Sequence, residues 1–77
     1  MEEHARLVLE YLATVQGHCA LPDIALRTSM PEHTVILALE ALEDLHYVTE
    51  QETASTSRCF QITDRGRLVL QAERKGR

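Results

Sequence analysis

The stretch from Leu21 to Glu50, LPDIALRTSMPEHTVILALEALEDLHYVTE, has the pattern of two helices joined by a tight turn. Pro22 suits the first position of a helix because its missing N–H has no partner there anyway. Pro31, which follows the turn, likewise suits the start of a helix, and a second apolar repeat begins after it. The pattern therefore predicts a short helix over residues 22–29 and a longer helix over residues 32–46.

The sequence before this stretch predicts another helix, over residues 3–16. Apolar residues recur there at spacings of three and four, which places them on one face of a helix. These residues are Ala5, Val8, Leu12 and Val15. Gly17 suits the end of this helix because glycine accepts the left-handed backbone conformation.

Residues 47–63 have the pattern of a β-hairpin. Two segments that suit strands, YVTEQE and RCFQIT, flank the polar loop TASTS. In the second segment Phe60 and Ile62 alternate with Cys59 and Gln61, so Phe60 and Ile62 are expected to face the core.

The end of the chain predicts one more helix. Thr63 can cap a helix over residues 64–74, and residues 75–77 then form a basic tail. Residues 1–77 are thus expected to form a single domain that is mainly α, with a small two-stranded hairpin.

This order of elements resembles the winged helix-turn-helix domains of MarR-, ArsR- and PadR-type bacterial regulators. The resemblance runs from about Arg6 to Leu70 and rests on Leu21–Glu50 followed by FQITDRGRLVL. It implies that residues 32–46 form the recognition helix, opened by Thr34 and Val35, and that the hairpin is the wing. It also implies a bacterial or phage regulator of transcription that binds duplex DNA. A homodimer is expected because one domain offers only one half-site.

Charge is distributed unevenly along the chain. Residues 1–52 carry ten acidic and two basic side chains, a balance of −8, whereas residues 53–77 carry two acidic and six basic side chains, a balance of +4. Basic side chains neutralise phosphates, so the C-terminal third is the part expected to approach DNA. The residues predicted to contact DNA are Arg58, Arg65, Arg67, Thr56, Ser57, His33 and Thr34. The alternative is that these cations are ordinary solvent-facing charges.

The predicted recognition helix departs from the family pattern. From Met30 to Glu52 there is no Lys or Arg, and there are six carboxylates. A helical wheel divides the helix into a core stripe and an outward face. The core stripe consists of Val35, Ala38, Leu39, Leu42 and Leu45. The outward face consists of His33, Leu37, Glu40 and Asp44, with Ile36 on its shoulder, where DNA-binding relatives usually carry basic or polar side chains.

Three interpretations of this acidic face stay open. It is a solvated surface, or a contact with a protein through Ile36, Leu37, Glu40 and Asp44, or a helix that enters the major groove. In the second case the chain is a protein-interaction winged helix that docks a basic partner or a second copy. Because carboxylates oppose phosphate binding, this helix favours the protein contact, while the wing and the tail favour DNA.

Composition favours a soluble cytoplasmic protein. The chain has 77 residues, of which 44% are hydrophobic and 26% charged, and no apolar run approaches the roughly 20 residues of a membrane helix. The acidic opening MEEHARLVLEYL lacks the features of a signal peptide. The two cysteines, Cys19 and Cys59, are expected to be thiols that act as small hydrophobes, not a disulfide.

The sequence predicts no metal, no cofactor and no enzymatic activity. His18, Cys19, His33, His46 and Cys59 do not have the regular short spacing of metal ligands. The three glycines are scattered, so there is no phosphate-binding loop. No serine has a recognisable histidine and carboxylate partner.

Overall fold

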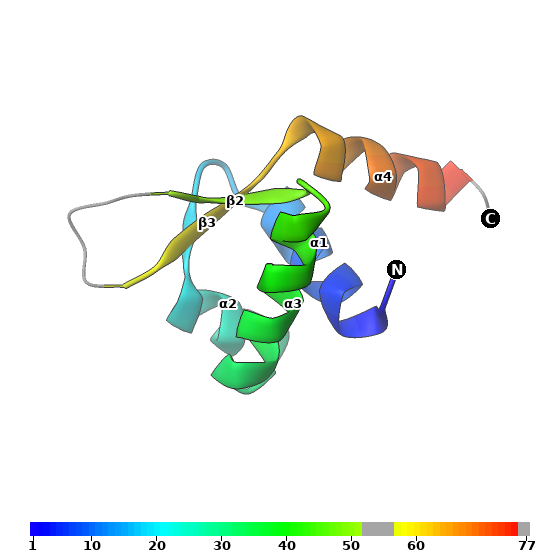
Figure 1. Cartoon of the computed structure of the whole chain (residues 1–77). Helices are drawn as coiled ribbons and strands as arrows, with labels where there is room; N and C mark the ends of the chain where they lie inside the picture. Colours follow the sequence, from blue (N-terminus) through cyan, green and yellow to red (C-terminus); the bar gives the residue numbers. More distant parts are fainter. Residues whose placement is uncertain (52–56, 76–77) are drawn as a thin grey trace.

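A computed structural model describes residues 1–51 and 57–75 of the chain (Figure 1). Within these residues the chain forms four helices and three strands. They are α1 (Glu3–Thr14), β1 (Cys19–Ala20), α2 (Leu21–Thr28), α3 (Glu32–Asp44), β2 (Val48–Gln51), β3 (Cys59–Ile62) and α4 (Asp64–Lys75). The predicted fold class, mainly α with a small wing, is confirmed. The helix ends differ by one or two residues from those predicted.

The small sheet has a third strand that the sequence did not predict. Its order is β1-β3-β2, with both pairs antiparallel. Cys19 pairs with Phe60 across β1 and β3, a contact between residues far apart in sequence. Phe60 and Ile62 are buried, as expected. Cys59 is buried too, because β3 is the central strand and pairs with a neighbour on each side.

The core lies between α1, α2, α3 and the inner face of the sheet. Its largest fully buried side chains are Phe60, Leu9, Leu12, Ile24, Leu39 and Leu42. In Figure 1, α3 stands in front of α1, the wing extends to one side, and α4 leads away from the helical body. Apolar contacts thus fix α2 and α3 relative to each other, which leaves their outer surfaces available for other contacts.

The end of α3 is a Schellman motif centred on His46. The N–H of Tyr47 donates to the carbonyl of Leu42 at 2.9 Å, and the N–H of His46 donates to the carbonyl of Glu43 at 2.9 Å. His46 has φ 63°, the left-handed conformation for which glycine is favoured. The chain therefore leaves the helix at Asp44, and Leu45 is 49% exposed, so its prediction as a core residue was wrong.

Thr63 caps α4, as predicted, and also ties it to the end of α3. Its hydroxyl donates to the carbonyl of His46 at 2.7 Å and accepts from the N–H of Gly66 at 3.1 Å. Gly66 is buried against the backbone of Tyr47, where a side chain has no room. These contacts fix the start of α4 beside the last turn of α3.

Candidate functional site

The outward face of α3 is arranged as the wheel predicts. His33, Leu37, Glu40 and Asp44 are exposed, and Leu37 is 66% exposed, whereas Thr34 is half-buried. Ile36 differs from its predicted partner Leu37, because it is half-buried and packs against the core. Leu37 is therefore the main apolar residue on this face.

The first turn of α3 offers backbone donors. Pro31 precedes the helix and provides no side-chain hydrogen bond to it. The N–H groups of the first turn have no partner within an α-helix, and the helix dipole adds a partial positive charge at this end. This turn, which carries His33 and Thr34, is suited to contact an anion.

The cation at the base of the wing, Arg58, is held by a carboxylate. Its Nε and Nη2 donate to the two carboxylate oxygens of Glu50 at 2.9 and 3.1 Å. Its guanidinium also lies 5.2 Å from the centre of the Phe60 ring. The hydrogen bonds from Arg58 lower the pKa of Glu50, and in turn those bonds raise the pKa of Arg58. Both side chains are partly exposed, so water screens the pair.

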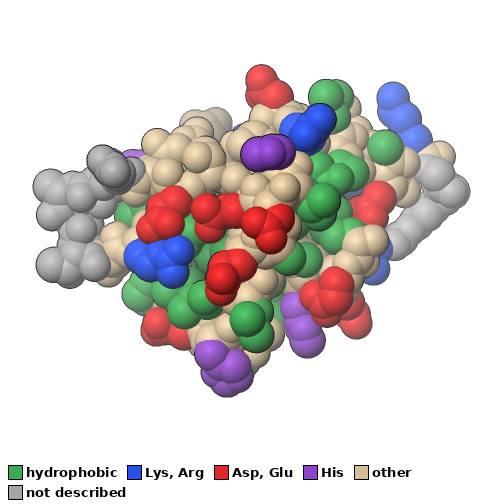
Figure 2. Space-filling view, in the orientation of Figure 1, with side chains coloured by type: hydrophobic (Ala, Val, Ile, Leu, Met, Phe, Trp, Pro, Cys, Tyr) green, Lys and Arg blue, Asp and Glu red, His purple; other side chains and the backbone are tan. Residues whose placement is uncertain are grey.

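Arg58 lies beside a group of acidic side chains at the C-terminal half of α3 and on β2. The members of this acidic cluster are Glu40, Glu43, Asp44 and Glu50. Burial raises the pKa of Glu43, and the charge of Glu50 raises it further, while Arg58 opposes the rise. Figure 2 shows acidic side chains gathered on this face beside a basic one. With four carboxylates and one guanidinium, this part of the surface repels phosphates.

The arginines predicted to contact DNA lie in three different surroundings. Arg58 is beside the acidic cluster, and Arg65 lines a hollow between α3 and α4. Arg67 donates from Nη1 to the carbonyl of Ala13 at 3.3 Å, at the end of α1. Ser57 is half-buried, and Thr56 lies outside the described residues. Whether these residues bind DNA stays a prediction.

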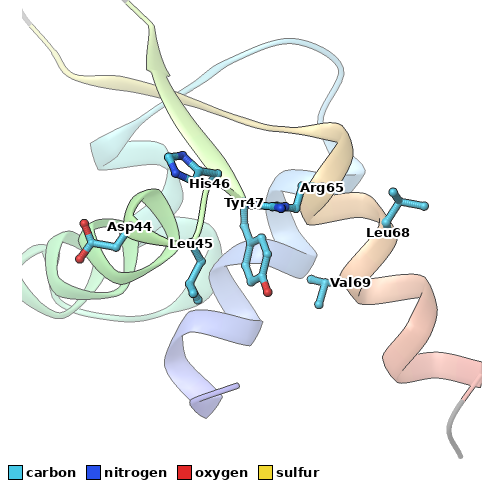
Figure 3. A pocket seen from close by; sticks show the side chains of 7 residues that line it. All are labelled: Asp44, Leu45, His46, Tyr47, Arg65, Leu68 and Val69. Atoms are coloured by element: carbon cyan, nitrogen blue, oxygen red, sulfur yellow. The ribbon is translucent and has the colours of Figure 1, made fainter.

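The hollow beside Arg65 is a feature that sequence reasoning missed. It has a volume of about 500 Å³ and is lined by residues 44–47 together with Arg65, Leu68 and Val69 (Figure 3). Leu68 is 64% exposed on its rim. The sequence carried one signal, since Leu68 is an apolar residue beside Arg67 in a predicted helix, but its position over the end of α3 depends on Gly66 and Thr63.

A second groove, of about 280 Å³, lies beside the outward face of α3. It is bordered by Thr34, Leu37, Ala38 and Ala41 on α3 and by residues 2, 4 and 5 at the start of the chain. The groove is shallow and lined mainly by small or apolar side chains. It continues the apolar surface of Leu37 toward α1.

Three features of the described residues bear on other classes of function. Over residues 1–51 and 57–75, no three His, Cys, Asp or Glu side chains are grouped so that they could hold a metal ion. Both cysteines are buried thiols. In the same ranges, every helix is too short or too polar to span a lipid bilayer.

Comparison with protein-family models and with curated proteins finds no match for the sequence. Solved structures do match. A MarR family transcription regulator superposes with a TM-score of 0.88 over 99% of the chain at 18% identity. A mutant of MepR from S. aureus, bound to an oligodeoxyribonucleotide, superposes with a TM-score of 0.84 over 94% of the chain at 23% identity. The reduced form of YodB from B. subtilis superposes with a TM-score of 0.81 over 96% of the chain at 17% identity.

The chain matches only part of each of these proteins. The chain covers 51% of the MarR family regulator, 54% of MepR and 74% of YodB. It thus spans about half the length of the first two proteins. At these identities the likeness concerns the fold, and the chain has the winged helix-turn-helix fold found in MarR-type transcription regulators.

Proposed function

We propose that the chain is a DNA-binding domain of a transcriptional regulator and acts in the cytoplasm. The observation that supports this most strongly is the fold, which is shared over almost the whole chain with transcription regulators, one of them bound to an oligodeoxyribonucleotide. A helix-turn-helix followed by a wing is the arrangement that places one helix in the major groove and a hairpin along the backbone. No enzymatic activity is part of this proposal.

The proposed contact uses the first turn of α3 and the base of the wing. The uncapped N–H groups around His33 and Thr34 suit a phosphate oxygen. Ser57 and Arg58, with the neighbouring Thr56, supply hydroxyl and guanidinium donors to the backbone. Arg65 and Arg67 extend this surface along α4. The acidic cluster is expected to stay away from the phosphates.

The Glu50 carboxylate competes with DNA for Arg58. A phosphate must replace the two hydrogen bonds between these side chains before Arg58 can contribute fully. Binding by one domain is therefore expected to be weak and strongly dependent on salt, with little preference for sequence.

The test is a titration of random duplex DNA at several salt concentrations, with the whole chain and with a triple variant. In the variant Arg58, Arg65 and Arg67 are replaced by alanine, and each lost phosphate contact should reduce the slope of log affinity against log salt by about 0.9. The control is Arg6→Ala with Arg27→Ala, two arginines outside the predicted contact. Unchanged affinity and slope in the triple variant would show that DNA does not bind through this surface.

A second candidate function is the binding of a basic protein through the outward face of α3. The exposed Leu37, the groove beside it and the acidic cluster support this candidate. Leu37→Arg separates the two functions. It should abolish a protein contact, because it places a charge in an apolar centre, and it should improve DNA binding if α3 enters the groove. Tighter DNA binding with no loss of any protein complex would exclude the second candidate.

A further inference from the structure

Leu37 and Glu40 lie one turn apart on the outward face of α3, an apolar side chain beside a carboxylate. Leu37 is 66% exposed, and Glu40 is exposed too. Side chains three residues apart on a helix are neighbours, with Cβ atoms about 5–6 Å from each other. We propose that this pair recognises cytosine in the major groove and binds it more tightly when C5 of the base carries a methyl group. The inference rests on the proposed function, since it requires that α3 enters DNA.

The Glu40 carboxylate is open to a ligand. Within residues 1–51 and 57–75, the ion pairs join Glu2 to His4 and Glu50 to Arg58, and neither includes Glu40. Ala41, the next residue, is exposed, and with Leu37 it borders the shallow groove beside the outward face of α3. Its small side chain leaves space around the pair. An acceptor therefore lies next to an apolar surface, and a flat base can reach both.

The carboxylate selects among the four bases by the groups that they present in the major groove. Guanine presents the acceptors O6 and N7 there, and thymine presents the acceptor O4. A carboxylate repels all three of these atoms. Cytosine and adenine present amino groups, N4 and N6, which donate to a carboxylate. Glu40 therefore favours cytosine or adenine.

Leu37 decides between these two bases. In adenine the amino group lies beside N7, and an apolar side chain would cover this acceptor without satisfying it. In cytosine the amino group lies beside C5, which bears no polar group, so Leu37 covers it without loss of a hydrogen bond. A methyl group on C5 adds apolar contact and leaves the amino group free to donate. Thymine has the same methyl group, but its O4 faces the carboxylate.

The floor of the major groove is also where DNA repels a carboxylate least. The groove is about 12 Å wide and about 8.5 Å deep, and the phosphates line its rims. The outward face of a recognition helix points to the base edges at the floor. Glu43, Asp44 and Glu50 still oppose the approach of phosphates, so the expected preference is a change of a few fold on a weak affinity.

The test compares two pools of random duplex DNA with the same sequences, one containing cytosine and the other 5-methylcytosine throughout. Fluorescence anisotropy with the whole chain should show about three- to fourfold tighter binding of the methylated pool, the effect of one methyl group removed from water. The slope of log affinity against log salt should be equal in the two pools, because a methyl group carries no charge.

Two leucine variants show whether Leu37 makes the contact. Leu37→Ala should bind the two pools equally, because it removes the apolar surface that meets C5. Leu68→Ala is the matched control, since Leu68 is 64% exposed but lies on α4, and it should keep the wild-type preference. Methylation also changes the shape of DNA, and a preference caused by shape would persist in Leu37→Ala. Thermal unfolding confirms that each variant is folded.

Glu40→Gln tests the choice of base. The wild type and the variant each select sequences from the unmethylated pool, and the bound fraction is sequenced. The wild type should enrich cytosine at one position by about twofold or more, whereas glutamine pairs with N6 and N7 of adenine and should shift the preference to adenine. Glu10→Gln makes the same change of charge at an exposed position of α1 and should select like the wild type.

The possible failures of this inference and of the proposed function differ. Equal binding of the two pools, unequal salt slopes, or a preference that survives Leu37→Ala would overturn the inference and leave DNA binding intact. The same holds if the wild type selects no cytosine, or if Glu40→Gln selects it as strongly as the wild type does. Absence of binding to either pool would contradict the proposed function, and the inference with it.

Discussion

Arg58 donates two hydrogen bonds to Glu50, from the residue that precedes β3 to the carboxylate on β2. The pair lies at the base of the wing, and Glu43 and Glu40 of α3 add further negative charge around the guanidinium. Arg58, the cation that we propose contacts the DNA backbone at the wing, is thus partly neutralised by the protein itself. Under the proposed function, the strength of DNA binding is therefore expected to be sensitive to Glu50.

Replacing Glu50 with glutamine is expected to strengthen DNA binding. The change releases Arg58 from its ion pair and removes one negative charge that repels phosphates. The slope of log affinity against log salt should become steeper by up to about 0.9 if Arg58 gains one full phosphate contact. Fluorescence anisotropy with labelled random duplex measures both quantities.

Glu10→Gln is the matched control, because it makes the same change of charge on an exposed position of α1. If Glu10→Gln strengthens DNA binding as much as Glu50→Gln does, the effect comes from net charge and the Arg58–Glu50 pair has no special role.

Much of the fold could be predicted because local patterns agree with the tertiary contacts. Val35, Leu39 and Leu42 recur at helical spacing and are all buried, and Phe60 and Ile62 face the core as expected. β1 could not be predicted in this way. Two residues carry no periodicity, and the strand exists because Cys19 pairs with a residue of β3 far along the chain.

The errors in predicting the candidate site also arise where a feature depends on how a helix ends or on contacts between distant segments. Leu45 fits the core stripe only if α3 continues past Asp44, and the left-handed His46 ends it there. The sequence around Arg58 does not reveal its carboxylate partner, because the register of the hairpin is what brings Glu50 beside it. The hollow beside Arg65 likewise depends on how α4 is attached to the end of α3.

Thr63→Ala is expected to reduce the free energy of unfolding by about 0.5–2 kcal/mol, the usual cost of losing a helix cap. The hydroxyl of Thr63 serves the N–H of Gly66 and the carbonyl of His46 at once, so alanine leaves both without this partner. Thr63→Ser keeps the hydroxyl and should retain most of the stability. Urea denaturation followed by circular dichroism compares the three proteins, and equal loss in both variants would contradict a role for the hydroxyl.

Gly66→Ala is expected to destabilise the protein by about 1–3 kcal/mol, as overpacking of a buried position does. Alanine favours a helix over glycine by about 1 kcal/mol, which alone would stabilise α4. The added Cβ would, however, overlap the carbonyl oxygen of Tyr47 and lie 2.8 Å from Cγ1 of Ile62. A backbone carbonyl cannot move aside as a flexible side chain can. Thermal unfolding measures the effect, with Gln71→Ala as the exposed control on the same helix, and a rise in stability would mean that the contact is looser.

Leu39→Ala is expected to cost about 2–5 kcal/mol, because it leaves a cavity where α3 meets the rest of the core. Leu39 is 1% exposed, whereas Leu37 on the same helix is 66% exposed. Leu37→Ala therefore serves as a control and should change stability by less than about 0.5 kcal/mol. The comparison is made by urea denaturation of both variants. A loss below about 1 kcal/mol for Leu39→Ala would show that this part of the core can close around the missing side chain.

Glu43→Gln is expected to stabilise the protein at neutral pH and to have less effect in acid. Burial, and then the charge of Glu50, raise the pKa of Glu43 above its ordinary value of 4.5, so the folded state disfavours its carboxylate. The penalty is fully present above the raised pKa and fades as the pH falls through it. It is gone below the ordinary value of 4.5, because the side chain is then protonated in both states. Glutamine removes the penalty at every pH.

The gain from Glu43→Gln at pH 7 should be under about 1 kcal/mol, since water still reaches this half-buried side chain and screens its charge. Urea denaturation from pH 7 to pH 4 should show the two proteins converging in stability. The same substitution made together with Glu50→Gln should gain less, because one of the causes of the raised pKa is then absent. If the difference between wild type and Glu43→Gln is constant across this pH range, the carboxylate carries no penalty in the folded state, and the acidic cluster is no obstacle to folding.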